Sequence, residues 1–186
     1  MSAFDNITGP LFLIGYMGSG KTTLGRALAC RLGCGFVDLD DYIEQTAGAS
    51  VKEIFANEGE AGFRMRERKA LEDIVLMKEV NIVACGGGTP CFFDNMEYMN
   101  EHGTTVLLDA TLESLNRRLT IMRSNRPLIA NLNDDELAAY IVKALESRMP
   151  YYQKARYRFA SDRLEDQSQI DESVDAFLKI FTKTIE

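Results

Sequence analysis

Short apolar runs alternate with longer stretches of helical periodicity along this chain. Residues 11–14, 81–85 and 104–109 are compact apolar runs, which are typical of strands buried on both faces of a sheet. Phe36 and Val37 form a shorter run of the same kind. Because helical segments separate these runs, the pattern predicts an α/β fold with a parallel sheet. Ligands of such sheets gather at the carboxyl ends of the strands.

The turn at residues 15–22 carries the clearest chemical signal. Its sequence, G-Y-M-G-S-G-K-T, fits G-x-x-x-x-G-K-[ST], in which backbone N–H groups cradle phosphates. Lys21 is expected to bind the β- and γ-phosphates, and the Thr22 hydroxyl to ligate Mg²⁺. A glycine-rich turn with a chance lysine is the alternative, but strand, helix, lysine and threonine are all in register. The predicted ATP contacts in this segment are Gly18, Ser19, Gly20, Lys21, Thr22 and Thr23.

Acidic residues follow the second predicted strand. Asp38 and Asp40 lie at its carboxyl end, where ligands are expected. Asp41 and Glu44 have the spacing of a helix capping box, which explains Asp41 but neither of the other two acids. We therefore expect a functional role for at least one of Asp38 and Asp40.

Two further helices are predicted before the strand at residues 81–85. Ser50 and Glu53 form a second capping box for a short helix to about residue 57, and Gly59 separates it from a longer helix. Basic residues crowd the first turns of the longer helix, where they oppose the macrodipole. One of them could bind a ligand, although a solvated charged face also explains them. They are Arg64, Arg66, Arg68 and Lys69.

Glycines and an acid mark the ends of the next two strands. The three glycines at 86–88 allow the backbone to approach a ligand closely, or form a flexible turn. A helix over residues 97–102 is expected to end at Gly103. Asp109 ends the fourth strand, either as a Mg²⁺-side acid or as the residue that closes the turn into a helix from Thr111.

The C-terminal third of the chain begins with an arginine-rich stretch. Helical periodicity is lost between residues 117 and 133, which predicts a mobile basic lid or a solvated loop. Asn133 and Glu136 form a capping box for a helix to about residue 147, and a last amphipathic helix is expected from about residue 169. Because there are no repeats or low-complexity linkers, we expect one domain.

Composition limits the classes of function. The chain has 186 residues, 46% of them hydrophobic, and a formal net charge of -7, so a general nucleic-acid binder is not expected. No apolar run approaches the roughly 20 residues of a membrane span, and the first residues lack a signal-peptide pattern, so we expect a cytoplasmic location. The four cysteines do not suggest a disulfide framework or a zinc site. The lone His102 indicates a core or surface role.

Taken in order and spacing, the motifs resemble the shikimate kinase family from residue 11 to about residue 159. They are the P-loop, F-V-D-L-D at 36–40, G-F-R at 62–64, G-G-G at 86–88, R-P-L at 126–128 and R-M-P-Y at 148–151. The resemblance implies a P-loop kinase fold of the nucleoside monophosphate kinase type, with a five-stranded parallel sheet flanked by helices and a mobile lid. It also implies a single domain over residues 1–186, with a substrate-binding region at about 38–66 and a lid at about 119–133.

The same resemblance implies ATP-dependent phosphorylation of the shikimate 3-hydroxyl, in the biosynthesis of chorismate and the aromatic amino acids. Asp40 is implied to hold the shikimate hydroxyls and to help activate the attacking one. Two arginines, Arg64 and Arg148, are implied to bind the substrate carboxylate. The implied shikimate contacts are Asp40, Arg64, Gly86, Gly87, Gly88 and Arg148.

On the ATP side, the resemblance places Asp38 near Mg²⁺ together with Thr22. It makes Arg126 a lid arginine that reaches the phosphates, so that the implied catalytic residues are Lys21, Asp40 and Arg126. Arg118 is implied to stack on adenine, and a segment at about residues 161–165 is implied to contact adenine as well.

From the residues alone, we conclude only that the chain is a small-molecule kinase. Two arginines outside the P-loop and the lid fit a planar carboxylate, and an acid beside them suits a hydroxyl acceptor. A gluconate-type or nucleoside monophosphate kinase is the alternative enzyme, and a P-loop switch module that hydrolyses ATP slowly is the alternative from another class. We expect ATP and shikimate as substrates, Mg²⁺ as cofactor, no nucleic acid or membrane partner, and a monomer.

Overall fold

The computed structural model of the chain describes residues 9–77, 80–123 and 128–182. Within these residues, a five-stranded parallel sheet has the strand order β2-β3-β1-β4-β5. The strands are β1 (Leu11–Ile14), β2 (Gly35–Asp38), β3 (Val80–Ala84), β4 (Thr104–Asp109) and β5 (Tyr157–Ala160). Because β1 pairs with both β3 and β4, the turn that follows it lies at the centre of the carboxyl edge of the sheet.

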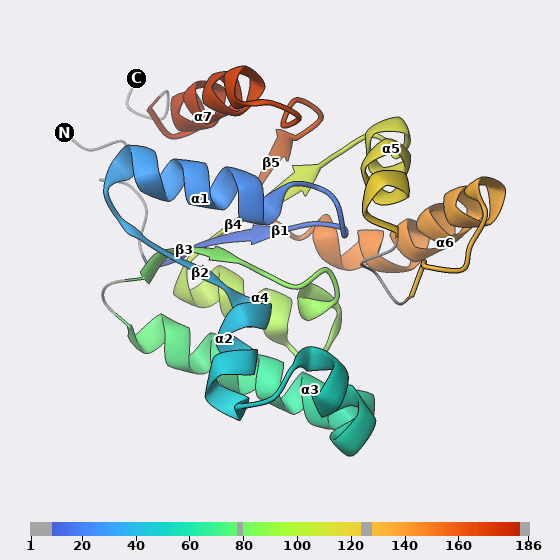
Figure 1. Cartoon of the computed structure of the whole chain (residues 1–186). Helices are drawn as coiled ribbons and strands as arrows, with labels where there is room; N and C mark the ends of the chain where they lie inside the picture. Colours follow the sequence, from blue (N-terminus) through green and yellow to red (C-terminus); the bar gives the residue numbers. More distant parts are fainter. Residues whose placement is uncertain (1–8, 78–79, 124–127, 183–186) are drawn as a thin grey trace.

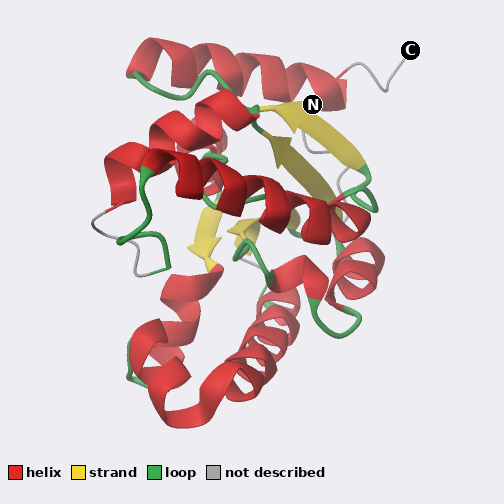
Figure 2. Cartoon of the chain, turned by 90° about the vertical axis from the view of Figure 1, so that its right-hand side faces the viewer, coloured by secondary structure: helices red, strands yellow, loops and turns green. Residues whose placement is uncertain are grey.

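Helices cover both faces of this sheet, as Figure 1 shows, and Figure 2 gives the view from the right-hand side of Figure 1. One face packs against α1 (Lys21–Leu32) and α7 (Gln167–Thr182). The helices that contribute to the other apolar layer are α2 (Leu39–Ala47), α3 (Val51–Leu76), α4 (Asn95–His102), α5 (Leu112–Met122) and α6 (Asp134–Tyr152). A short 3₁₀ helix, η1 (Thr89–Cys91), follows β3.

Alternating side chains of the strands divide between the two layers. In β1, Phe12 and Ile14 belong to the layer with α2 to α6, whereas Leu11 and Leu13 belong to the layer with α1 and α7. All four side chains are fully buried. This is the pattern of a strand covered on both faces, and it confirms the prediction from the continuous apolar run.

Helix boundaries agree with the sequence at several positions. Ser50 and Asn133 each form the predicted capping box, with Glu53 and Glu136 respectively. Gly59 interrupts α3 with φ 69 and ψ -174, as expected of a residue that separates two helices.

The predicted capping box at Asp41 and Glu44 is wrong. Helix α2 begins earlier, at Leu39, and its N-cap is Asp38, whose side chain accepts a hydrogen bond from the Asp40 N–H. Glu44 instead accepts a hydrogen bond from the backbone N–H of Val51 and so joins α2 to α3. The strand leads directly into the helix, so the first acid reaches the orphan donors of the first turn.

Two helix ends in the C-terminal third were also predicted wrongly. Helix α5 continues into the arginine-rich stretch as far as Met122, because Leu115 and Leu119 are buried one turn apart and keep its apolar face on the core. Helix α6 does not end near residue 147 but runs to Tyr152 with Pro150 inside it. Burial of Tyr152 and its hydrogen bond to the Gly87 carbonyl offset the backbone bond that the proline lacks.

Strand β5 was not located from the sequence, because it has no apolar run. Of its residues only Phe159 is buried, because β5 is an edge strand of the sheet. The last helix, α7, begins at Gln167, two residues before its predicted start.

The cysteines and His102, for which no chemical role was predicted, have ordinary structural environments. All four cysteines are free, and the His102 ring stacks on Tyr98 with ring centres 4.1 Å apart. In the described part of the chain, no helix is long and apolar enough to cross a membrane.

The contact of α1 with the sheet depends on Gly25. A Cβ at this position would lie 2.6 Å from the Phe36 ring and 3.1 Å from Leu13 Cδ1. We expect Gly25→Ala to destabilise the protein by about 1–3 kcal/mol through overpacking, measured by urea unfolding. Cys30→Ala, an exposed change in the same helix, should stay within about 0.5 kcal/mol. Equal stability of the two variants would contradict this account.

Candidate active site

The turn between β1 and α1 has the backbone of a phosphate-binding loop. Gly20, the N-cap of α1, has φ 93, and a Cβ there would lie 2.3 Å from Leu164 Cδ1. Gly15 has φ 141, and a Cβ there would lie 2.6 Å from the Leu108 carbonyl oxygen. Glycine is therefore required both by conformation and by space. The loop leaves the N-terminus of α1 directed at the carboxyl edge of the sheet, where an anion is stabilised.

Lys21 lies over this loop. Its ammonium donates to the carbonyl oxygens of Gly15 and Tyr16, at 2.9 Å each. The cation is thus held at the same turn as the N-terminal N–H groups of α1. This arrangement suits the predicted binding of the terminal phosphates of a nucleotide.

Asp38 joins the loop to the next strand. Its Oδ2 accepts a hydrogen bond of 2.7 Å from the Thr22 hydroxyl, while its Oδ1 caps α2. The sequence argument that capping does not explain Asp38 was therefore wrong, because one carboxylate does both. A hydroxyl and a carboxylate in contact are hard oxygen donors of the kind that Mg²⁺ prefers.

This donor set fits Mg²⁺ better than a metal held by protein alone. Among the described residues, no three His, Cys, Asp or Glu side chains are grouped closely enough to hold a metal ion. Mg²⁺ usually takes only one or two protein ligands and completes its shell with phosphate oxygens and water. Thr22 and Asp38 could supply those ligands beside the P-loop.

The three glycines after β3 bring the predicted acceptor-binding residues together. A Cβ on Gly86 would lie 3.2 Å from Asp40 Oδ1. On Gly87 it would lie 3.1 Å from Arg148 Nη1, and on Gly88 2.9 Å from Arg64 Nη2. One acid from α2 and two arginines from α3 and α6 therefore meet along one stretch of backbone.

Arg64 is held by a buried network that the sequence did not reveal. Its Nη1 donates to Glu67 Oε2 at 3.0 Å, and its guanidinium carbon lies 3.9 Å from the centre of the Phe92 ring. Glu67 is fully buried and accepts a second bond of 2.5 Å from the Thr89 hydroxyl. The only signal in the sequence was the i, i+3 spacing of Arg64 and Glu67 on a helix.

Arg148 has different surroundings. Its guanidinium carbon lies 5.3 Å from the centre of the Tyr16 ring, and burial raises the pKa of Tyr16 to about 12. Burial also raises the pKa of Tyr152, so both phenols are neutral at physiological pH. In the part of the chain that the structure describes, no carboxylate forms an ion pair with Arg148. The sequence placed Arg148 after a helix end, but it lies inside α6.

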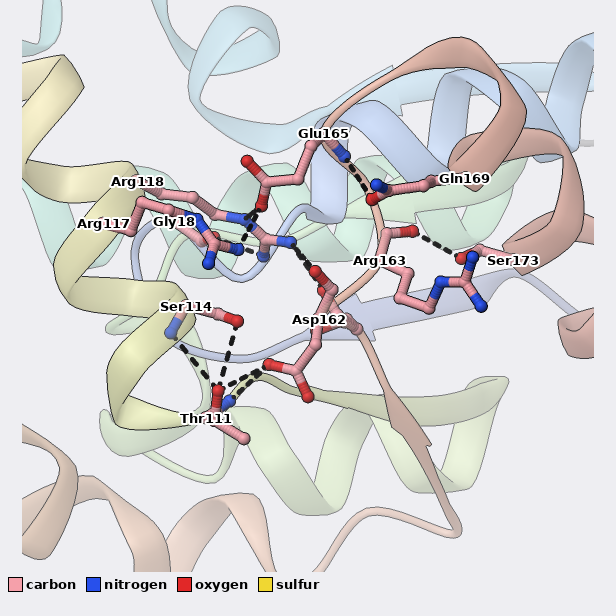
Figure 3. A network of polar contacts seen from close by, with 11 residues as sticks. Gly18, Thr111, Ser114, Arg117, Arg118, Asp162, Arg163, Glu165, Gln169 and Ser173 are labelled. Carbon is pink, nitrogen blue, oxygen red and sulfur yellow. Dashed lines mark hydrogen bonds and ion pairs between the residues drawn. The ribbon is translucent and has the colours of Figure 1, made fainter.

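On the other side of the P-loop, Arg118 connects three segments. It donates to the carbonyl oxygens of Gly18, Ser161 and Asp162 and to the Glu165 carboxylate (Figure 3). Arg118 and residues 161–165, each expected at the adenine, therefore lie together. The contact of Arg118 with adenine stays a prediction.

The remaining predicted residues are placed as follows. Thr23 is exposed on α1, and the Ser19 side chain is buried in the P-loop. Arg126 lies outside the described residues. Asp109 does not cap the turn into α5, because Thr111 itself is the N-cap, and the Asp109 carboxylate accepts a 2.8 Å bond from Arg158 Nε. A role of Asp109 on the Mg²⁺ side stays a prediction.

Known proteins with the same sequence pattern identify the family. A family profile described as shikimate kinase matches residues 17–180. The chain belongs to the shikimate kinase family. A shikimate kinase from Phocaeicola vulgatus is 50% identical over 173 residues, which cover 93% of this chain and 98% of that protein.

Solved shikimate kinases share the fold. The enzyme from Bacteroides thetaiotaomicron superposes with a TM-score of 0.89 at 46% identity, covering 94% of this chain and 99% of the other. The enzyme from Acinetobacter baumannii, in complex with shikimate, has a TM-score of 0.81 at 32% identity and covers 99% and 98%. Family membership makes the chain an ATP-using phosphotransferase, and it confirms the predicted P-loop kinase fold.

The contact of Thr22 with Asp38 predicts how Mg²⁺ dependence changes on substitution. Asparagine remains a good N-cap, so Asp38→Asn should keep α2 and the melting temperature but lose a charged metal-side oxygen. We expect the free Mg²⁺ concentration for half-maximal turnover to rise about tenfold or more. ATP turnover against free Mg²⁺ at saturating ATP measures this.

Asp41→Asn is the matched control for this prediction. Asp41 is an exposed acid on the same helix, paired at 3.6 Å with Arg26. Its Mg²⁺ dependence should match that of the wild type. If Asp38→Asn and Asp41→Asn showed the same Mg²⁺ dependence, Asp38 would not contribute to Mg²⁺ binding.

Proposed function

We propose that this enzyme transfers the γ-phosphoryl group of ATP to the 3-hydroxyl of shikimate, giving shikimate 3-phosphate and ADP. The observation that carries the proposal is the convergence of Asp40, Arg148 and Arg64 on the backbone of residues 86–88, beside the P-loop. Shikimate is a small ring that bears one planar carboxylate and several hydroxyls. Two arginines and one acid along a side-chain-free wall match these groups.

On this proposal, Arg64 and Arg148 hold the carboxylate and thereby set the orientation of the ring. Asp40 accepts a hydrogen bond from the attacking hydroxyl and takes its proton as the bond to phosphorus forms. Lys21 and the N–H groups at the start of α1 stabilise the charge on the phosphoryl oxygens. Thr22 and Asp38 would hold Mg²⁺, which supplies further charge neutralisation at the phosphates when bound.

Several assignments belong to the same proposal and rest on the family resemblance. Arg126 reaches the phosphates when a lid over about residues 119–133 closes, and Arg118 contacts the adenine. The substrate-binding region spans about residues 38–66 of a single domain. The enzyme acts as a monomer. The reaction takes place in the cytoplasm, where ATP is available and the four free cysteines stay reduced.

The test is acceptor-dependent formation of ADP. With Mg²⁺ and ATP present, we expect ADP to form rapidly with shikimate and only at background with gluconate, with a nucleoside monophosphate, or with no acceptor. Release of phosphate from ATP at the same rate without an acceptor would indicate a switch module instead. Faster turnover with gluconate or a monophosphate would assign a different kinase.

The two arginines predict a specific loss on conservative substitution. Arg64→Lys keeps the charge but loses the planar fork, so we expect weaker shikimate binding by about 1–3 kcal/mol. The affinity for ATP should change little. Calorimetric titration of shikimate measures the change. Arg66→Lys is the matched control, because Arg66 lies on the same helix and pairs with Glu58 away from this wall.

A shikimate analogue with a neutral amide in place of the carboxylate isolates the role of the arginines. The wild type should bind the amide much more weakly than shikimate. Arg64→Lys and Arg148→Lys should then cost little against the amide. Equal binding of amide and acid by the wild type would refute the carboxylate clamp.

A further inference from the structure

The position of the P-loop determines on which side of it a nucleoside can lie. Strand β1 is central, and the acceptor-binding groups follow β2 and β3 on one side of it. The other side is formed by the ends of β4 and β5. There Leu164 packs directly against Gly20 of the P-loop. A nucleotide whose phosphates lie on this loop therefore extends its base toward residues 161–165.

Arg118 is fixed at that side by four hydrogen bonds (Figure 3). Nη1 donates to the Gly18 carbonyl at 3.2 Å, and Nη2 to the Ser161 and Asp162 carbonyls at 2.9 and 2.8 Å. Nε donates to Glu165 Oε1 at 3.0 Å. The edges of the guanidinium are thus turned into the protein. What Arg118 can offer a planar ligand is the flat face of the group.

Glu165 adds a negative charge to this arrangement, and a negative charge alone would disfavour the binding of a nucleotide. Its Oε1 also accepts a 2.9 Å bond from Arg117, which is 48% exposed. Hydrogen bonds from Arg117 and then Arg118 hold the pKa of Glu165 below its usual value, so the carboxylate is ionised at neutral pH. A carboxylate near a bound polyphosphate opposes binding by Coulomb repulsion. The ion pairs with Arg117 and Arg118 offset this charge.

We propose that Glu165 is a positioning residue for the nucleotide base: it fixes the plane of Arg118, and Arg118 links the base-side segment 161–165 to the P-loop through the Gly18 carbonyl. The inference rests on the proposed function in taking ATP as the donor and Arg118 as the residue that contacts its adenine. Glu165 contacts the arginines and acts through Arg118.

Asp162 makes the same joint rigid from the other side. Its Oδ1 accepts bonds of 2.8 Å from both the N–H and the hydroxyl of Thr111 (Figure 3). The first residues of α5 are thereby tied to the segment after β5. Since Arg118 is carried by α5, its backbone is held in place and the remaining freedom lies in its side chain. Three backbone carbonyls hold its Nη atoms, and Glu165 adds the bond that holds Nε.

The test compares a ligand that has a base with one that lacks it. Glu165→Gln should raise the Kd for ADP about three- to tenfold, because the ion pair of Arg118 with the 31% exposed Glu165 is lost and the guanidinium plane is held less firmly. The Kd for tripolyphosphate, which has phosphates but no base, should not change. The KM for shikimate should also stay at its wild-type value. Calorimetric titration of the full-length protein gives both Kd values.

A double-substitution cycle decides whether Glu165 acts through Arg118. In an Arg118→Ala background, adding Glu165→Gln should cause no further loss of ADP affinity. Glu172→Gln, which removes the exposed ion pair with Arg163 in the same region, is the matched control and should leave the Kd for ADP unchanged. Glu165→Asp serves as a second variant if the amide does not fold.

Three results would overturn the proposal. These are an unchanged Kd for ADP in Glu165→Gln, an equal loss for ADP and tripolyphosphate, and additive losses in the double variant. None of them depends on the acceptor. A failure here is therefore distinguishable from a failure of the proposed function, which would appear as ATP turnover that does not need shikimate in the wild type.

Discussion

One carboxylate, that of Asp38, connects the two halves of this active site. Its Oδ1 caps α2 and its Oδ2 accepts the Thr22 hydroxyl of the P-loop. The start of α2, which carries Asp40, is therefore tied to the loop that binds phosphate. The acceptor side also meets the P-loop at Gly87, which lies against the backbone of Gly15 and Met17, and at Arg148, which lies over the Tyr16 ring. Positioning the two reactants against each other is the main requirement of phosphoryl transfer.

The positive charge that binds the anionic substrates comes from individual arginines in the site, because the chain as a whole is acidic. Long-range attraction cannot concentrate such substrates, so arginines must make the site positive. The two acceptor-side arginines are stabilised differently. Arg64 is paired with the buried Glu67, whereas Arg148 lies against the neutral phenols of Tyr16 and Tyr152. Since no carboxylate of the described residues pairs with it, Arg148 brings a positive charge that they leave largely uncompensated, and Arg64 brings a fixed geometry.

Local patterns predicted most of the fold and the position of the P-loop between β1 and α1. Buried runs identified four strands, and capping residues located the starts of α3 and α6. Predictions failed where a local signal was overridden by packing. Pro150 does not end α6 because Tyr152 is buried beyond it, and β5 escaped notice because an edge strand needs little apolar sequence. Asp38 was mistaken for a residue without a capping role because its strand leads straight into α2.

The sequence by itself determined the phosphate-binding loop, the parallel sheet and the identity of the polar residues at the strand ends. These follow from short-range spacing, since a P-loop needs only consecutive residues in register. The tertiary structure alone decided which of those residues meet. Glycines 86–88 bring together an acid from α2 and arginines from α3 and α6. Arg118 joins the P-loop to Ser161 and Asp162, which follow Arg118 by more than 40 residues in the chain. Such contacts depend on how the helices pack on the sheet, which local sequence patterns do not encode.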